Sequence, residues 1–380
     1  MFRKYLFAAA ALLCSVGAAA VSLDDTGPTT KDELGERLFF DVNLSANRTQ
    51  ACATCHDPEY AFADPRGMAS IGDDGVSIGD RNAPTASYAA FTPAFGKDAS
   101  GAWVGGQFHD GRASALEDQA GGPPLNPAEM GMPDKASVLA RLVEDPIYAQ
   151  AFPAMFGADV LNDPETAYSA MTQAIAAFER TPEFSPFESK YDRFLRGEVE
   201  LSGLEELGRV LFFSEQFTNC NLCHQLRTSP IDPRETFSNY SYHNIGVPEN
   251  VELRAQNGVA LGTLDEGLAA NPVVDGDPAQ VAKFRTPTLR NVAVTGPYMH
   301  NGVFEDLRTV VLFYNQYNTR VEARRINPET GEPFRVPQYG KTLSFEELTH
   351  GPALDDQRVD ALVAFMKTLT DARYEHLLVE

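Results

Sequence analysis

Cys52-Ala-Thr-Cys55-His56 and Cys220-Asn-Leu-Cys223-His224 are the two stretches that decide the fold of this 380-residue chain. Each has the form Cys-x-x-Cys-His, which is the attachment motif of c-type haem. The two thiols of such a motif add across the vinyl groups of the porphyrin, and the histidine that follows binds the iron. Two copies therefore predict two covalently bound haem c groups, one for each motif.

The same cysteine pattern is compatible with two other functions. A Cys-x-x-Cys pair also occurs in redox disulfides, and two pairs could together bind zinc. Neither use requires a histidine directly after the second cysteine, which both copies have. The fifth cysteine, Cys14, lies in an apolar N-terminal stretch, so the motifs account for the other four. Haem attachment is the favoured interpretation.

The N-terminus has the pattern of a secretory signal. Arg3 and Lys4 precede an apolar run over residues 5–16, and small residues follow up to Ala20. This pattern predicts a signal peptide over residues 1–20, cleaved near Ala20. The run is too short for a membrane anchor. Export agrees with haem c attachment, which takes place outside the cytoplasm, and it predicts a periplasmic protein in a cell with two membranes.

The formal net charge of −22 is strongly acidic. Such a surface argues against a nucleic-acid partner and against anionic membranes. It is compatible with attraction of a basic partner such as a small cytochrome, and equally with simple solubility. Charge alone does not decide between these two interpretations.

A short repeat precedes the two motifs. Leu34-Gly35-x-x-Leu38-Phe39-Phe40 lies before the first motif, and Leu207-Gly208-x-x-Leu211-Phe212-Phe213 lies before the second. Each predicts a short helix that brings an aromatic pair to a haem edge, although a plain core stripe has the same spacing. The repeat favours two duplicated haem domains, over residues 21–196 and 197–380, with the boundary near Gly197.

Helix signals dominate the rest of the chain. Asp163-Pro164 predicts a helix start, with an end before Pro182. Ser202 with Glu205, and Ser344 with Glu347, predict capping boxes, and Asp355 predicts the start of the last helix. Residues 57–133 and 227–287 are rich in Gly, Pro, Asn and Asp, which is typical of long loops. The predicted fold is mainly α, with two cytochrome-c-like domains, long irregular loops, and haems near a shared interface.

Two further segments carry a family resemblance. Residues 107–130 contain Gln-Phe-His-Asp-Gly-Arg, Leu-Glu-x-Gln, a proline, and Asn-Pro-x-Glu-Met; residues 286–302 begin Thr-Pro-Thr-Leu-Arg-Asn-Val and end Asn-Gly. Together with both haem motifs, these segments resemble the bacterial di-haem cytochrome c peroxidase family, including its MauG branch. The resemblance covers most of the mature chain. It implies reduction of hydrogen peroxide with electrons from a small cytochrome or from a side chain of a partner protein.

The resemblance also implies a peroxide pocket. Glu129 matches the distal carboxylate over the haem of His56, and Gln119 and Pro123 match other members of that pocket. A carboxylate there can take a proton from the iron-bound oxygen and return it to the leaving oxygen. Without the resemblance, Glu129 would be an ordinary surface glutamate.

A second axial ligand is implied for the haem of His224. Many family members have a methionine there, but the matching residue here is Tyr314, as in the MauG branch. Pattern alone would make Tyr314 a core aromatic residue of an amphipathic helix, and Met299 is the nearest methionine rival. The loop over residues 57–81 contains no histidine, so the peroxide haem is expected to be open at rest unless Met68 closes it.

Further site residues follow from the same resemblance. The Asn82 side chain and the main-chain oxygens of Thr295 and Pro297 match a calcium site, whose hard oxygen donors suit that ion; by itself, Asn82 would be a turn residue. His109 replaces a family tryptophan between the haems, so Trp103 is a candidate substitute relay. His109 could hold a haem propionate or be a core histidine, and His300 is expected to organise the haem surroundings.

Two other functions compete with the peroxidase interpretation. A non-enzymatic electron carrier would have two six-coordinate haems and no reaction with peroxide. A redox or peroxide sensor would turn over slowly and bind a partner in one oxidation state.

Overall fold

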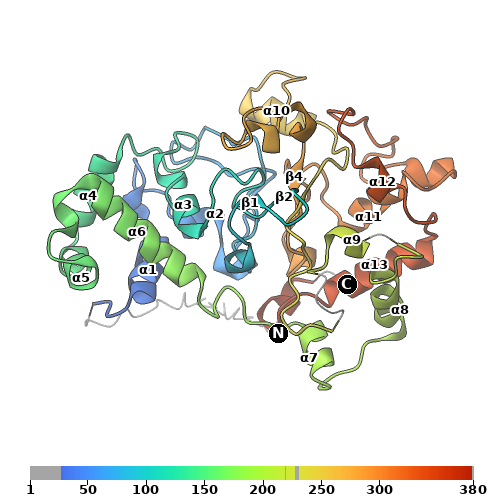
Figure 1. Cartoon of the computed structure of the whole chain (residues 1–380), viewed down its shortest axis with the longest axis horizontal. Helices are drawn as coiled ribbons and strands as arrows, with labels where there is room; N and C mark the ends of the chain where they lie inside the picture. The colour runs from blue at the N-terminus through green and yellow to red at the C-terminus, as the bar shows by residue number, and fades with distance from the viewer. Residues whose placement is uncertain (1–26, 219, 227–230, 379–380) are drawn as a thin grey trace, which may run out of the picture.

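The computed structural model describes residues 27–218, 220–226 and 231–378, and it is built mainly from helices (Figure 1). The signal peptide predicted for residues 1–20 lies outside the described residues. The prediction of a mainly α fold is confirmed, because the strands of the described part form only two short antiparallel pairs. These pairs are β1 (Gly96–Lys97) with β2 (Trp103–Val104), and β3 (Tyr242–His243) with β4 (Phe284–Arg285).

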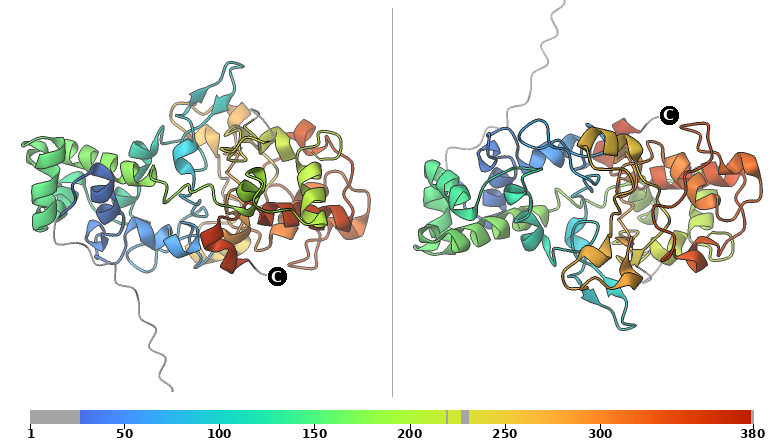
Figure 2. Two further views of the ribbon diagram at one scale, coloured as in Figure 1. Left: turned by 90° about the horizontal axis from the view of Figure 1, so that it is seen from below. Right: turned by 90° about the horizontal axis from the view of Figure 1, so that it is seen from above.

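Most of the helices, including all the longest ones, gather at the two ends of the molecule (Figures 1 and 2). One end contains α1 (Lys31–Phe39), α4 (Lys135–Glu144), α5 (Pro146–Phe156) and α6 (Pro164–Glu179). The other contains α7 (Lys190–Leu195), α8 (Gly203–Phe212), α11 (Leu307–Asn315), α12 (Phe345–Leu348) and α13 (Asp356–Lys367). Each end has its own hydrophobic core, one drawn from residues 34–184 and the other from residues 191–369.

Irregular chain fills the space between these helical ends, as both views of Figure 2 show. The strand pairs lie in this region together with α10 (Val251–Asn257). The short helices α2 (Cys52–Cys55) and α3 (Leu116–Ala120) lie beside the first end, and α9 (Cys220–Cys223) lies in the second end, where Cys220 packs against its core (Figure 1). The two predicted loop regions therefore include brief regular elements that their composition did not reveal. The 3-10 turns are Val42–Leu44, Pro58–Tyr60, Ala89–Phe91, Pro123–Leu125, Val160–Asn162, Leu268–Ala270, Pro278–Gln280, Val292–Val294, Glu322–Arg325 and Ala372–Leu377.

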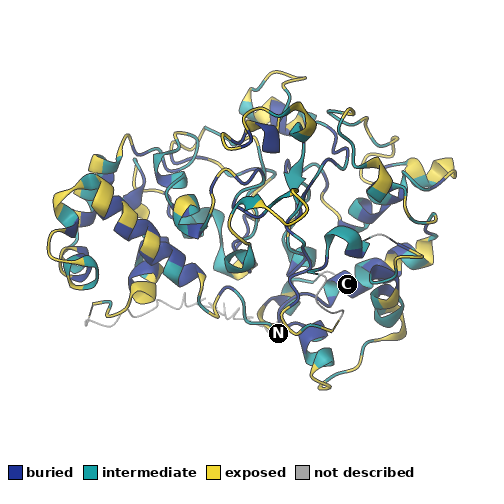
Figure 3. Cartoon of the chain, viewed as in Figure 1, coloured by how far each residue is buried: buried dark blue, intermediate teal, exposed yellow. Residues whose placement is uncertain are grey.

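The same helix crossing occurs in both halves. Gly35 of α1 lies against the Ala174 carbonyl of α6, and Gly208 of α8 lies against the Ala361 carbonyl of α13. In each crossing the next near atom is the Cβ of a phenylalanine four residues further along. A Cβ added to Gly35 would lie 2.9 Å from that atom, and one added to Gly208 would lie 2.8 Å from it. Only a residue without a side chain allows this approach, and the inner faces of α6 and α13 are buried as a result (Figure 3).

The first copy of the repeated aromatic pair is a core feature, contrary to the prediction that it reaches a haem edge, whereas Phe212 of the second copy lines the cavity beside the second motif. Phe39 is fully buried and packs edge-on against Phe62, Phe178 and Phe184. Phe40 is 45% exposed. The first ring of the pair therefore fills the core behind the crossing, because that face of α1 turns toward α6 and not toward the centre of the molecule.

Most helix starts follow the predicted caps. Asp163 caps α6, Asp355 caps α13, and Ser202 with Glu205 forms a capping box on α8. The capping box predicted at Ser344 is wrong. Its hydroxyl makes no cap hydrogen bond to α12 and lies 3.3 Å from the His243 ring instead. Within the described ranges, no helix is both long and apolar enough to cross a bilayer.

The glycine crossing gives a test of the fold. Replacing Gly35 or Gly208 with alanine should lower the thermal unfolding midpoint, because overpacking typically costs about 1–3 kcal/mol, although glycine-to-alanine changes in helices otherwise stabilise by roughly 1 kcal/mol. Gly203→Ala is the matched control, since nothing lies within 4 Å of the added carbon. Circular dichroism melts would measure all three. Equal midpoints for G35A, G208A and G203A would show that the crossings are not close-packed.

Candidate active site

Both haem motifs open into one cavity of about 1100 Å³. This volume exceeds the roughly 300–1,000 Å³ typical of a pocket for one small ligand. Apart from Cys52, every residue predicted for the site lines the cavity: Cys55, His56, Asn82, His109, Gln119, Pro123, Glu129, Cys220, Cys223, His224, Thr295, Pro297, His300 and Tyr314. The folded chain thus brings together residues from segments that lie far apart in the sequence.

The first motif is held by a one-turn helix. The main-chain N–H of His56 donates to the Cys52 carbonyl at 2.9 Å, which closes α2. The His56 Nδ1 lies 3.2 Å from the Phe62 carbonyl oxygen and donates to it, so Nε2 is left to bind a metal. Burial lowers the pKa of His56. The ring is therefore a neutral imidazole, which is the form that ligates iron.

The second motif repeats this arrangement. His224 Nδ1 donates to the Phe237 carbonyl oxygen at 3.0 Å, and burial lowers the pKa of His224 to about 4. Phe62 and Phe237 both have left-handed backbones, with φ of 54° and 56°. Such values are uncommon for bulky residues and tend to occur at functional sites. Here they turn each carbonyl toward the histidine ring.

The residues present fit two haem c groups. The four motif cysteines are free thiols, as thioether attachment requires. Each histidine keeps one ring nitrogen for iron. The cavity also contains a cation that could pair with the haem propionates, because Arg285 lines it. The Arg285 side chain makes only a long hydrogen bond, 3.3 Å, to the Phe108 carbonyl oxygen. Burial lowers the pKa of Arg285, and the groups that act on it are tyrosines, not carboxylates.

Glu129 stands in the wall of the cavity near the first motif. Asn126, which also lines the cavity, donates from Nδ2 to Glu129 Oε1 at 2.7 Å. Burial raises the pKa of Glu129, and the Asn126 bond and the charge of Arg112 oppose this only in part. A raised pKa makes this carboxyl group easier to protonate than a solvent-exposed glutamate, which suits a group that exchanges protons. Gln119 at the end of α3 and Pro123 in the next turn share this wall.

Tyr314 lies in the cavity wall on α11, close to the second motif. Burial is the largest influence on its phenol and raises its pKa, and the thiols of Cys223 and Cys220 add to this effect. These charge interactions place the phenol beside the haem-attachment sulfurs. Met299 lines the same cavity from the turn after Pro297. The geometry thus brings both candidate ligands of the second haem into one space.

A hydrogen-bonded path joins His109 to His300 through Asn82. His109 Nε2 donates to the Asn82 carbonyl oxygen at 2.9 Å, and the Asn82 N–H donates to the His300 carbonyl oxygen at 2.8 Å. Burial lowers the pKa of His109 to about 4 and that of His300 to about 3. The His300 ring stacks on Phe284, with centroids 3.6 Å apart. Both rings are neutral parts of the cavity wall.

Two residues considered as alternatives lie outside the wall of the cavity. Met68 contacts Asn250, whose Nδ2 approaches its sulfur at 3.1 Å. Trp103 stacks on Phe95 in the β1–β2 hairpin, with centroids 5.0 Å apart, under the amine of Lys97. Neither is among the cavity-lining residues. In the described structure, Met68 and Trp103 thus lie behind or beside the cavity wall and not in it.

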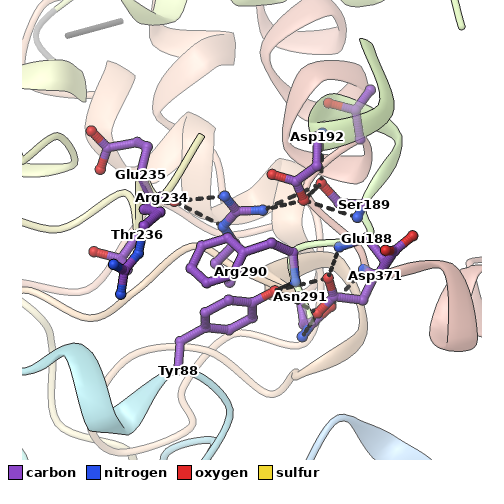
Figure 4. A network of polar contacts seen from close by, with 12 residues as sticks. Tyr88, Glu188, Ser189, Asp192, Arg234, Glu235, Thr236, Arg290, Asn291 and Asp371 are labelled. Atoms are coloured by element: carbon purple, nitrogen blue, oxygen red, sulfur yellow. Dashed lines mark hydrogen bonds and ion pairs between the residues drawn. The ribbon is translucent and has the colours of Figure 1, made fainter. Parts of the chain in front are cut away.

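A buried polar cluster supports the second motif from behind (Figure 4). Arg290 is fully buried, and its Nε and one terminal nitrogen donate to the Glu235 carbonyl oxygen at 2.9 and 2.7 Å. Its other terminal nitrogen pairs with Asp192 at 2.6 Å. These bonds hold the turn that presents the Phe237 carbonyl to His224. Arg290 thus helps to position the ring of His224, the predicted iron ligand.

The same cluster reaches into the N-terminal half. Tyr88 donates from its hydroxyl to Asp371 at 2.8 Å, and Asn291 donates to the other Asp371 oxygen at 2.9 Å. The Tyr88 ring lies 5.3 Å from the Arg290 guanidinium (Figure 4). Segments far apart in the chain therefore meet at one buried set of charges beside the cavity.

Asn126 and Arg290 lie within the segments that carry the family resemblance, but the sequence assigned them no role, and it gave no signal for Arg285. The spacing of three residues between Asn126 and Glu129 was a usable signal, because it permits a side-chain bond within one turn. Arg285 and Arg290 have no such local signal, since their partners come from distant segments.

The fold and the cavity define a c-type cytochrome with two haem sites, and comparisons with known proteins place it more closely. The family model described as di-haem cytochrome c peroxidase matches residues 29–200. The methylamine utilization protein MauG of Paracoccus denitrificans is 56% identical over 91% of this chain and 90% of its own length. The cytochrome c peroxidase Ccp of Escherichia coli is 31% identical over 77% of this chain and 54% of its own.

A solved structure agrees with these relatives. The diheme peroxidase BthA from Burkholderia thailandensis superimposes with a TM-score of 0.81 at 32% identity, covering 93% of this chain and 89% of that one. The chain belongs to the di-haem cytochrome c peroxidase family that includes MauG. It is accordingly a haem peroxidase-type oxidoreductase, and its cofactors are two haem c groups, as the two motifs predicted.

The Arg290 cluster gives a prediction about the second motif. Arg290→Ala should lower the free energy of unfolding by about 3–5 kcal/mol, because it leaves buried acceptors and Asp192 without their partner. Arg308→Ala is the control: Arg308 pairs with Asp360 at the surface, where such pairs contribute about 0–1 kcal/mol. Thermal melts of the purified proteins would compare them. If R290A melts like R308A, the cluster does not support the fold as described.

Proposed function

We propose that this protein is a periplasmic di-haem c peroxidase in which hydrogen peroxide reacts at the haem of His56 and oxidising equivalents pass to the haem of His224. The observation that carries this proposal is Glu129, a buried carboxyl with a raised pKa that lines the same cavity as His56 and His224. Bound at the two motifs, the haems would supply iron redox chemistry. A plain electron carrier has no need of such a carboxyl group.

Glu129 is the general acid–base of the proposal. Asn126 fixes Oε1, which leaves Oε2 to exchange a proton with the peroxide. With peroxide in the cavity, Glu129 would take the proton of one peroxide oxygen and return it to the other, which would leave as water, while the bound haem would supply the two electrons that cleave the O–O bond. Gln119 offers an amide for hydrogen bonding to the peroxide. Pro123 has no N–H and forms an apolar wall that limits water.

Tyr314 is proposed as the second axial ligand of the haem of His224. Protein-bound haems with tyrosine ligands are known. Burial raises the pKa of the free phenol, so the phenolate forms only with a cation beside it. An anionic oxygen ligand stabilises ferric and higher oxidation states, which suits a haem that stores oxidising equivalents. Met299 is the rival ligand on the same cavity wall.

We further propose a calcium ion held by the Asn82 side-chain oxygen and the main-chain oxygens of Thr295 and Pro297. All three residues line the cavity. The Asn82 Nδ2 donates to the Met68 carbonyl oxygen at 3.2 Å, which leaves Oδ1 for a cation. Oxygen donors of this kind, completed by water, suit calcium. His109 and His300 would stiffen this segment through their bonds to Asn82.

The two hydrophobic cores support two haem domains meeting at the cavity, close to the predicted ranges 21–196 and 197–380. Tyr191 of α7 belongs to the second core, so we propose a boundary a few residues before Gly197. Residues 1–20 are the proposed signal peptide, which directs the protein to the periplasm.

The electron source is proposed to be a small cytochrome or an oxidisable side chain of a partner protein. A relative named cytochrome c peroxidase supports the first source, and a relative named methylamine utilization protein supports the second. The net charge of −22 would favour encounter with a basic partner and is unsuited to nucleic acid.

Glu129→Gln tests this function. The variant should keep both haems and its resting absorbance spectrum, because the amide has the same shape. Its rate of reaction with hydrogen peroxide should fall by about 10²–10⁴-fold, the usual contribution of a general acid–base. Stopped-flow absorbance would measure the rate. Glu59→Gln, at an exposed glutamate three residues after His56, is the control and should react like the unmodified protein. An unchanged rate in E129Q would remove Glu129 from the mechanism.

A further inference from the structure

Glu179 can be compared with the residue at the matching position of the other half, because the helix crossing occurs in both halves. Ala174 of α6 matches Ala361 of α13, because each contacts the crossing glycine of its half. Five residues further along, α6 carries Glu179 and α13 carries Met366. Both side chains are buried, at 4% and 7% exposure, and both line the haem cavity. The fold accepts an apolar residue at this position, so the carboxyl group of Glu179 is not a requirement of the crossing.

The Glu179 carboxyl has an unsatisfied oxygen. Its Oε2 is buried and has no hydrogen-bond partner among the described residues. An ionised carboxylate in such a place is costly, because the charge is neither hydrated nor hydrogen-bonded. Burial accordingly raises the pKa of Glu179 to about 8. The group is therefore a carboxylic acid at neutral pH, with a proton that it can release close to that range.

Two partly exposed charged residues influence the ionisation of Glu179. Arg180 favours its ionised form and Glu117 opposes it. These two pair with each other at 2.7 Å and are 45% and 35% exposed, so the charges that act on Glu179 belong to an ion pair at the surface. Glu117 belongs to α3, the helix that also carries Gln119. On the inner side, Glu179 acts on the Cys52 thiol of the first motif.

Among the described residues, the charges that act on Glu179 are those of Arg180 and Glu117. Helix α5 carries no Asp, Glu, Lys or Arg. On α1, α3 and α4, Glu36 is repelled by Asp32 and Glu183, and the remaining charged groups contact other residues: Lys31 the Phe156 ring, Glu33 Thr29, Arg37 Asp145, Asp118 the Ala115 N–H, Lys135 Glu165, Arg141 the Ala46 carbonyl, and Glu144 Arg48. Among the described residues, proton exchange at Glu179 thus depends on Arg180, Glu117 and whatever charge is present in the cavity.

We propose that Glu179 is a proton-exchange site of the His56 half of the cavity, which takes up a proton from the solvent side and releases it again as the charge in the cavity changes. Reduction of peroxide, H₂O₂ + 2 H⁺ + 2 e⁻ → 2 H₂O, consumes two protons from solvent. Glu129 moves a proton between the two oxygens but does not supply these. Glu179 can pass these protons from solvent into the cavity. Met366, the matching residue of the other half, cannot carry a proton. The inference rests on the proposed haem at His56.

Electrostatics fixes the sign of the effect. An electron added to the cavity stabilises the protonated form of Glu179, and removal of an electron favours release of the proton. Reduction therefore takes up a proton in the pH range between the two pKa values of Glu179. The reduction potential of the His56 haem should fall as pH rises through that range.

Spectroelectrochemical titration of the holoprotein between about pH 6 and pH 9 tests the proposal, with Glu179→Gln and Glu179→Met as variants. Haem content is measured first. The expected result is a potential of the His56 haem that falls with pH in the unmodified protein and falls less steeply in both variants. Met366→Leu is the matched control and should leave the slope unchanged. Equal slopes in the unmodified protein and in E179Q or E179M would overturn the proposal.

A second measurement covers the case in which both variants lose haem. Infrared difference spectra between oxidised and reduced protein would then be recorded on E129Q, which removes the other described cavity carboxyl whose pKa is raised by burial. A protonated carboxyl band that shifts in D₂O and changes on reduction supports Glu179 as the exchanging group, and no such band overturns it. The peroxidase proposal fails separately, through the E129Q rate, since neither potential nor infrared band depends on turnover.

Discussion

The contact of a glycine with a helix carbonyl, made once in each half, is the constraint on which the rest of the structure depends. At Gly35 and at Gly208 two helices meet with no side chain between them. The approach buries one face of α6 and one face of α13 and sets where their C-terminal ends lie. Those ends reach the cavity, where Glu179 and Met366 stand in its wall. The two halves therefore contain similar helix crossings, and different residues at matching positions, such as Glu179 and Met366, make the two sites chemically different.

The haem motifs and the family segments were predictable because their chemistry depends on local spacing. Cys-x-x-Cys-His forms one helical turn followed by its histidine, and the structure has this turn twice. Capping at Asp163, Ser202 and Asp355 was predictable for the same reason. Ser344 was not, because the distant His243 ring lies beside its hydroxyl.

Features that depend on distant contacts could not be predicted in this way. The repeated phenylalanines have the spacing of a helix face, but only the packing of α1 on α6 shows which way that face turns. Arg290 is one arginine among many until Glu235 and Asp192 surround it. In the sequence, Glu179 is an ordinary glutamate at a helix end. Its proposed role rests on the buried Oε2, which has no hydrogen-bond partner among the described residues, and on Met366 at the matching position of the other half. Burial and pairing of charge are tertiary properties, so they cannot be read along the chain.

The central claim is that two haems share one cavity but differ in ligation, with the His56 haem open to peroxide and the His224 haem closed by Tyr314. The absence of a histidine from residues 57–81 and the position of Met68 outside the cavity wall support an open first site. Low-temperature electron paramagnetic resonance of the fully oxidised protein tests this claim most directly. The account predicts one high-spin and one low-spin ferric signal. Two low-spin signals would mean that both irons are closed at rest and would contradict it.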